Sequence, residues 1–136
     1  MEKIDKLICL LLAVQNYSKD IHYNAKGDSF YSKHLLVDRV QENISDYIDS
    51  IKEVFYLGEM GKEPLPSKEY LKNTIELIPE IQKEDKKNFE ALRKLLISAI
   101  QELEKIKTLS KGEENLLGGI AENLQSSLGL INQQVK

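Results

Sequence analysis

The chain has 136 residues, a length that fits one buried core, and we expect residues 1–136 to form a single domain. Its net charge of −3 gives no general attraction to nucleic acid or to an anionic membrane, and its single Cys excludes an internal disulfide. Aliphatic residues dominate, Trp is absent, and only seven Gly and three Pro interrupt the sequence. This composition is typical of a helical bundle.

The first expected helix covers residues 3–25, where apolar residues recur at three- and four-residue spacing. Its apolar run from Ile8 to Val14 faintly resembles a signal peptide, but polar and acidic residues interrupt the segment and no small-residue cleavage site follows. The run is also too short to span a bilayer. Because Cys9 lies within it, we expect a buried helix in a protein of the reducing cytoplasm.

A short break follows this helix. Gly27 is suited to end a helix in the left-handed conformation, and Asp28 or Ser29 can cap the next one. Such a break predicts an antiparallel helix pair centred near residue 28. His22 and His34 are each six residues from that centre, and they are the only histidines in the chain. We therefore predict that the two imidazoles lie level on neighbouring helices.

Residues 28–57 contain no Gly or Pro and predict one long helix. At 100° per residue, four candidate ligands fall at about 0°, 40°, 60° and 100° around its axis, namely His34, Asp38, Asp49 and Glu53. One imidazole and three carboxylates would then share one face. The four cannot bind one metal within one chain, because His34 and Asp49 are roughly 22 Å apart along the axis.

A second copy of this helix would bring the ligands together. The residue numbers of His34 and Glu53 add to 87, and so do those of Asp38 and Asp49. If two copies pack antiparallel about a two-fold axis near residues 43 and 44, His34 and Asp38 of one chain lie beside Glu53 and Asp49 of the other. Carboxylates gathered at an interface repel each other unless a cation neutralises them. Histidine and carboxylate ligands in a bundle suit iron, with zinc or manganese as substitutes.

The remaining segments complete a four-helix bundle. A loop with Gly and Pro follows at residues 58–66, and a short helix is expected over residues 67–73. Pro79 suits the first turn of a third long helix that runs to about Thr108, and a fourth helix follows Gly112. The third helix should place seven residues on its core side: Ile81, Phe89, Leu92, Leu96, Ala99, Leu103 and Ile106. Three internal glycines make the fourth helical pattern the weakest.

Several of these segments resemble the Dps-type miniferritins of the ferritin-like superfamily. The run from Ile21 to Phe30 is similar to the family's His-Trp-Asn-x-x-Gly-x-x-Phe, with Tyr23 in place of the Trp. The resemblance continues in the spacing His-x3-Asp-x10-Asp-x3-Glu, which ends in Leu57-Gly58. It covers most of the chain, with specific motifs between residues 21 and 70. It implies an all-α, ferritin-like four-helix bundle with a short extra helix in the long connection between helices two and three.

The resemblance also implies a function. Family members oxidise Fe(II), usually with hydrogen peroxide, at ferroxidase sites on the two-fold interfaces of a twelve-subunit shell. They store the ferric product as mineral inside the shell and so protect against oxidative damage. On matching positions, His22, His34 and Asp38 would come from one subunit, and Asp49 and Glu53 from its partner. These five residues are the expected metal ligands and catalytic residues of a homo-oligomeric iron-storage protein.

Other interpretations stay open. Each acid also fits a solvated helix face, so the chain would alternatively be a non-enzymatic helical bundle that serves in assembly or partner binding. Chromosome compaction is a third hypothesis, but the Lys-rich terminal extension of many DNA-binding members is lacking, so direct DNA binding is not expected. The residues three before each histidine are Lys19 and Tyr31, so the Glu-x-x-His pairs of an intrachain di-iron bundle are missing.

Overall fold

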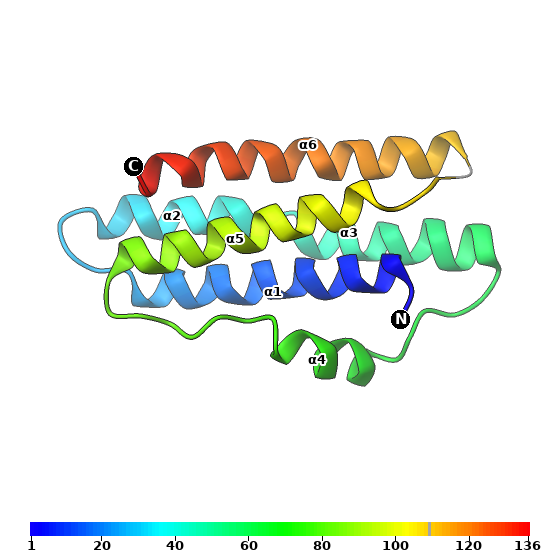
Figure 1. Ribbon diagram of the computed structural model, residues 1–136, viewed down its shortest axis with the longest axis horizontal. Helices are drawn as coiled ribbons and strands as arrows, with labels where there is room; N and C mark the ends of the chain where they lie inside the picture. The colour runs from blue at the N-terminus through cyan, green and yellow to red at the C-terminus, as the bar shows by residue number, and fades with distance from the viewer. Residues whose placement is uncertain (109) are drawn as a thin grey trace.

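The computed structural model describes residues 1–108 and 110–136, and within these ranges the chain is helical and contains no strand. Four long helical segments pack side by side, and a short helix lies outside them (Figure 1). The second long segment is made of three consecutive pieces, the last of which is a π-helix, η1. The elements are α1 (Lys3–Asn24), α2 (Phe30–Gln41), α3 (Ile44–Ile51), η1 (Lys52–Met60), α4 (Ser67–Ile75), α5 (Asp85–Glu104) and α6 (Lys111–Gln134).

The four long segments form a closed ring. Helix α1 contacts α2 and α5, and α6 contacts α5 on one side and α2, α3 and η1 on the other. Figure 1 shows that α1 and α6 run in one direction while α2–α3–η1 and α5 run in the other, so every neighbouring pair is antiparallel. The connection from η1 to α5 returns along the bundle and contains α4, which packs on α1. The predicted all-α bundle with a short helix in its long connection is confirmed.

Helix α1 lies at the centre of the core, as its wide apolar surface predicts. Leu7, Ile8, Leu11 and Val14 are fully buried, because α1 is covered by α2, α4 and α5. Burying such an aliphatic side chain contributes about 1.5–3 kcal/mol relative to leaving it in water. The predicted bounds of this helix agree with the structure to within one residue.

The prediction of one uninterrupted helix over residues 28–57 is wrong. Helix α2 ends at Gln41, and the exposed pair Glu42 and Asn43 forms a turn before α3 begins. Asn has a low helix propensity because its side chain competes for backbone groups. From Lys52 onward the helix is a π-helix, in which each amide bonds the carbonyl five residues before it. The spacing of 100° per residue therefore does not apply across the turn or beyond residue 52.

The third long helix begins later than predicted. Helix α5 begins at Asp85 rather than near Pro79. The cause is the buried Asn88, whose Oδ1 accepts from the Gln82 amide at 2.7 Å and whose Nδ2 donates to the Gln82 carbonyl at 3.0 Å. The Tyr17 hydroxyl also donates to Asn88 Oδ1 at 3.0 Å. These bonds replace the helical ones that residues near 82 would otherwise make.

Most of the predicted core of this helix is confirmed. Five of its residues are buried: Phe89, Leu92, Leu96, Ala99 and Leu103. Ile81 is 37% exposed because it precedes the helix, and its assignment to the core is wrong. Ile106 is partly buried and lies beyond Glu104, where α5 ends four residues before the predicted Thr108.

The fourth long helix continues through Gly118, Gly119 and Gly129, and each of them faces open space. Because Gly in a helix interior costs about 0.5–1 kcal/mol relative to Ala, we expect Gly118→Ala and Gly129→Ala each to stabilise the protein by about that amount. Urea denaturation would measure this. Gly27→Ala is the control, since Gly27 has φ +86° and Ala is strained there. A stabilising effect at all three positions would contradict the explanation.

Candidate metal centre

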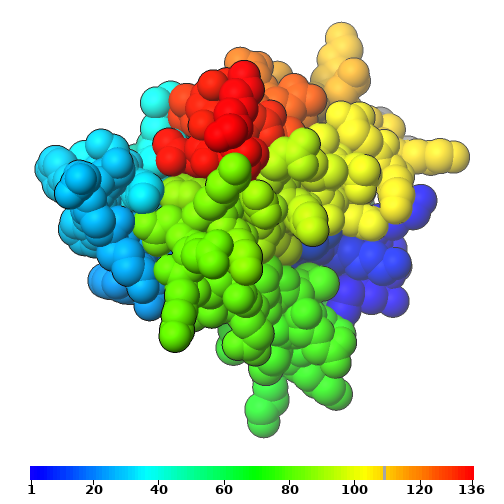
Figure 2. All heavy atoms as spheres, turned by 60° about the vertical axis from the view of Figure 1, so that its left-hand side comes forward, coloured from blue at the N-terminus to red at the C-terminus, as the bar shows by residue number. Residues whose placement is uncertain are grey.

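The two histidines meet across the α1–α2 hairpin, as the position of Gly27 predicts. Their rings are stacked, with centroids 3.4 Å apart and planes 23° from parallel. His22 belongs to the last turn of α1 and His34 to the first half of α2. Gly27, between the two helices, has φ +86° and so adopts the left-handed conformation that the turn requires. In Figure 2 this hairpin, in light blue, forms an edge of the molecule beside the start of α5.

Each histidine is held by the backbone of the other. His22 Nδ1 lies 3.1 Å from the His34 carbonyl oxygen, and His34 Nδ1 lies 2.8 Å from the His22 carbonyl oxygen. A carbonyl oxygen only accepts hydrogen bonds, so we assign the proton of each neutral ring to Nδ1. The lone pair of each ring then resides on Nε2. Histidines that bind metal ions commonly donate their other ring N–H to a backbone carbonyl in this way.

Asp38 is the third member of the group on this chain. Its Oδ1 lies 3.6 Å from His22 Nδ1, and its side chain is 52% exposed. Two aromatic rings flank the histidines: Tyr23 contacts the His22 ring edge to face at 4.9 Å, and Phe30 lies 5.0 Å from the His34 ring. The centre is therefore half-buried, with an aromatic wall and an open side.

The two other predicted ligands lie elsewhere in the chain. Asp49 is on α3 and Glu53 is on η1, and both are exposed. Neither has a hydrogen bond or ion pair to the histidines among the described residues. Across residues 1–108 and 110–136, no three His, Cys, Asp or Glu side chains of the single chain are arranged to hold a metal ion. The structure thus unites His22, His34 and Asp38 and leaves Asp49 and Glu53 apart from them.

An ion pair fixes the hairpin to the rest of the bundle. Lys33, next to His34, places its Nζ 2.9 Å from Asp85 Oδ2 at the start of α5. The same oxygen accepts from the Lys26 amide at 3.2 Å. Asp85 is largely buried, so its ion pair with Lys33 is partly shielded from solvent, and the two contacts together hold α2 and the connecting turn to α5. The sequence interpretation did not identify this contact, because its partners are 52 residues apart.

A second polar cluster was also missed by the sequence interpretation. Asp5, near the start of α1, is 2% exposed, and its Oδ1 accepts from the hydroxyls of Tyr56 at 2.5 Å and Tyr70 at 2.7 Å. The one available signal was a lone carboxylate on the apolar stripe of the first helix, between Ile4 and Ile8. Because a buried carboxylate needs hydrogen-bond donors, such a residue indicates partners from distant segments.

Burial of tyrosine hydroxyls gives the protein a predicted alkaline transition. Burial, with the charge of Asp20 adding to it, raises the pKa of Tyr17 to about 12, and burial with the hydrogen bond to Asp5 raises the pKa of Tyr56 and Tyr70. A folded-state pKa above the unfolded value of about 10 stabilises the fold below pH 10, and this contribution is lost as the pH rises through the folded pKa.

We therefore expect the free energy of unfolding to change little up to about pH 10 and to fall steeply towards pH 12. Urea denaturation at a series of pH values, with tyrosine absorbance as the monitor of ionisation, would measure both effects. Ionisation of all six tyrosines near pH 10 in the folded protein would contradict the prediction.

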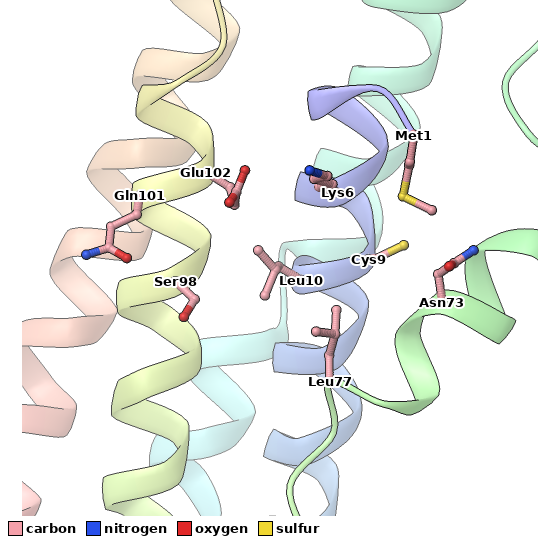
Figure 3. Close-up of a pocket in the computed structure, with 9 residues that line it drawn as sticks. All are labelled: Met1, Lys6, Cys9, Leu10, Asn73, Leu77, Ser98, Gln101 and Glu102. Carbon is pink, nitrogen blue, oxygen red and sulfur yellow. The ribbon is translucent and has the colours of Figure 1, made fainter.

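A separate cavity of about 380 Å³ lies between α1, α4 and α5, and Figure 3 shows Cys9 and Leu10 at its wall. Burial raises the pKa of the Cys9 thiol, and its Sγ donates to the Tyr70 carbonyl oxygen at 3.8 Å. A thiol held in the protonated form is a poor nucleophile and a poor metal ligand. Cys9 is thirteen residues before His22 on α1, roughly 20 Å along the axis, so this cavity is not part of the histidine centre.

Over the described residues, none of the helices combines the length and the apolar character needed to cross a bilayer. Comparisons of the chain with protein-family models, with curated proteins and with solved structures give no match.

Proposed function

We propose that this chain is an iron-sequestering miniferritin. It oxidises Fe(II), with hydrogen peroxide as the oxidant, at sites shared between two copies of the chain, and stores the ferric product inside an oligomeric shell. The observation that carries the proposal is the stacked pair of His22 and His34, in which both Nδ1 atoms bond backbone carbonyls. Each imidazole keeps its Nε2 available as a ligand for a first-row transition metal, and iron is the substrate that the resemblance implies.

The chemistry assigns a role to each part of the site. The imidazoles bind Fe(II) through Nε2, while the carboxylates of Asp38, Asp49 and Glu53 stabilise Fe(III) more than Fe(II) and so favour oxidation. Two Fe(II) ions lose one electron each, one peroxide molecule accepts both electrons, and its O–O bond breaks to give two hydroxide ions. Removing Fe(II) and peroxide together removes both reagents of hydroxyl-radical chemistry.

The second half of each site must come from another subunit. His22, His34 and Asp38 lie together on one chain, whereas Asp49 and Glu53 are exposed and lie apart from them. The two-fold pairing predicted from the residue spacing would supply the missing carboxylates. Its axis passes near residues 43 and 44, where the structure has the turn between α2 and α3.

One further feature supports a ferritin-like fold. The bundle has one long crossover connection, between η1 and α5, and ferritin-like folds share this topology. A closed shell of twelve chains would have a mass of roughly 190 kDa under closed point-group symmetry. The alternative is a bundle without enzymatic activity that serves in assembly or partner binding, for which the exposed acids are only a solvated surface.

One experiment separates these hypotheses. Fe(II) is mixed anaerobically with hydrogen peroxide, with and without the protein, and the ferric absorbance is followed in time. We expect a much faster rise with the protein, and Zn(II) added beforehand should suppress it by occupying the imidazoles. The non-enzymatic alternative predicts no acceleration and no increase in thermal stability on metal binding. Light scattering on the same sample would give the mass of the assembly.

A further inference from the structure

The π-helix η1 carries Glu53, one of the predicted ligands, and nothing near Glu53 fixes its side chain. Glu53 is exposed and has no hydrogen-bond or ion-pair partner among the described residues. The backbone of η1 therefore sets where Glu53 stands, and no contact within the chain restricts its rotamer. A π-helix is rare and persists only where its surroundings favour it over an α-helix, so the contacts of η1 decide the position from which Glu53 extends.

One such contact is the bond from Tyr56 to Asp5. Tyr56 is three residues after Glu53 on η1 and is 2% exposed. Its hydroxyl reaches Asp5 Oδ1 of α1 at 2.5 Å, and Phe55 beside it is also buried. Consecutive side chains are separated by a smaller angle around the axis in a π-helix than in an α-helix, because its turn holds more residues. This smaller angle lets both aromatic residues face the core.

Gly58 fits the same backbone geometry. It stands five residues after Glu53, the separation that π-helical hydrogen bonds join. A methyl group at Gly58 would lie 3.2 Å from the Glu53 carbonyl oxygen, closer than ordinary van der Waals contact. In α6, by contrast, a methyl group at Gly118 or Gly129 would meet nothing within 4 Å. The absence of a side chain at Gly58 therefore avoids a close contact with the Glu53 carbonyl oxygen in this turn.

From these contacts we propose that Tyr56 and Asp5 are positioning residues for Glu53: their hydrogen bond fixes the register of η1 and thereby sets the position from which the carboxylate reaches the metal of a partner subunit. The proposal rests on the function proposed above. Asp5 does not touch the metal, and it acts through Tyr56 and the backbone of residues 53–56. The positioning contact and the histidine pair lie at opposite ends of α1, so within one chain they are independent.

Tyr70 provides a matched control. Its hydroxyl donates to the same Asp5 oxygen at 2.7 Å, but it belongs to α4 and not to η1. Tyr56→Phe and Tyr70→Phe each remove one hydroxyl from this oxygen. Tyr56→Phe removes a hydroxyl that belongs to η1, the helix that carries Glu53, whereas Tyr70→Phe removes one that belongs to α4 and also accepts from the Leu65 amide at 3.3 Å. A loss of packing alone would affect both variants alike.

The test is a double-mutant cycle on Zn(II) affinity, measured by calorimetry on the assembled protein. We expect Tyr56→Phe to weaken Zn(II) binding about tenfold and Tyr70→Phe to leave it unchanged. In a Glu53→Ala background, Tyr56→Phe should have no further effect, because its influence acts through that carboxylate. Gly58→Ala should weaken binding in the same Glu53-dependent way.

Equal effects of Tyr56→Phe with and without Glu53, or equal effects of Tyr56→Phe and Tyr70→Phe, would overturn the positioning role. The two proposals fail separately, because the cycle uses zinc and needs no iron oxidation. Coupling in the cycle without accelerated Fe(II) oxidation would reject the ferroxidase and keep the positioning role. Accelerated oxidation without coupling would keep the ferroxidase and reject the positioning role. A wild-type protein that binds no Zn(II) would reject both.

Discussion

Mixing two inactive variants is expected to restore part of the Fe(II) oxidation activity. One variant is His22→Ala/His34→Ala, and the other is Asp49→Ala/Glu53→Ala. The activity of each variant alone should fall by more than about tenfold, since each lacks two of the five ligands. When the two chains are co-expressed at equal levels, half of the dimers are mixed, and each mixed dimer holds one complete site out of two. We therefore expect about a quarter of the wild-type activity.

The control for this experiment mixes two variants whose substitutions remove ligands from the same half of the site, the half that contains the histidines. A mixture of His22→Ala/His34→Ala chains with Asp38→Ala chains has no complete site in any dimer, so its activity should stay at the level of the separate variants. Activity equally restored in both mixtures, or in neither, would contradict a site shared across a two-fold axis. Full activity of Asp49→Ala/Glu53→Ala alone would show that the partner carboxylates are not ligands.

The largest expected effect on stability comes from the buried carboxylate of α1. Asp5→Ala leaves the hydroxyls of Tyr56 and Tyr70 without their acceptor in a buried position. An unsatisfied buried donor costs about 1–3 kcal/mol, so we expect the free energy of unfolding to fall by about 3 kcal/mol. For a domain of this size that is a large part of the total. Urea denaturation followed by circular dichroism would measure the change.

Two further variants identify the cause of this loss. Asp5→Asn keeps an oxygen acceptor of the same shape and should lose only about 1 kcal/mol. Asp46→Ala removes an exposed carboxylate and should change the stability by less than about 0.5 kcal/mol. If Asp5→Ala costs no more than Asp46→Ala, the tyrosine hydroxyls have found water or other partners and the cluster is not a source of stability.

Local patterns were enough to predict much of the candidate centre. The apolar periodicity of α1 and the left-handed Gly27 specify an antiparallel hairpin, and the hairpin alone sets His22 beside His34. Both depend on residues close together in the chain, where helix geometry converts spacing into position. The reciprocal bonds from each Nδ1 to the opposite carbonyl were not predicted, because they depend on ring orientation rather than on spacing.

The sequence by itself determined the helical composition, the bundle and the hairpin that joins the histidines. Only the tertiary structure decided where α5 begins and that the end of the second long segment is a π-helix. The physical reason is that side chains from distant segments control these features. Asn88 accepts a hydrogen bond from Tyr17, which is 71 residues away in the sequence. Tyr56 donates one to Asp5, which is 51 residues away. Helix propensity depends only on residues that are close together along the chain, so it does not include these bonds between distant segments. The bonds compete with the local backbone preferences and outweigh them.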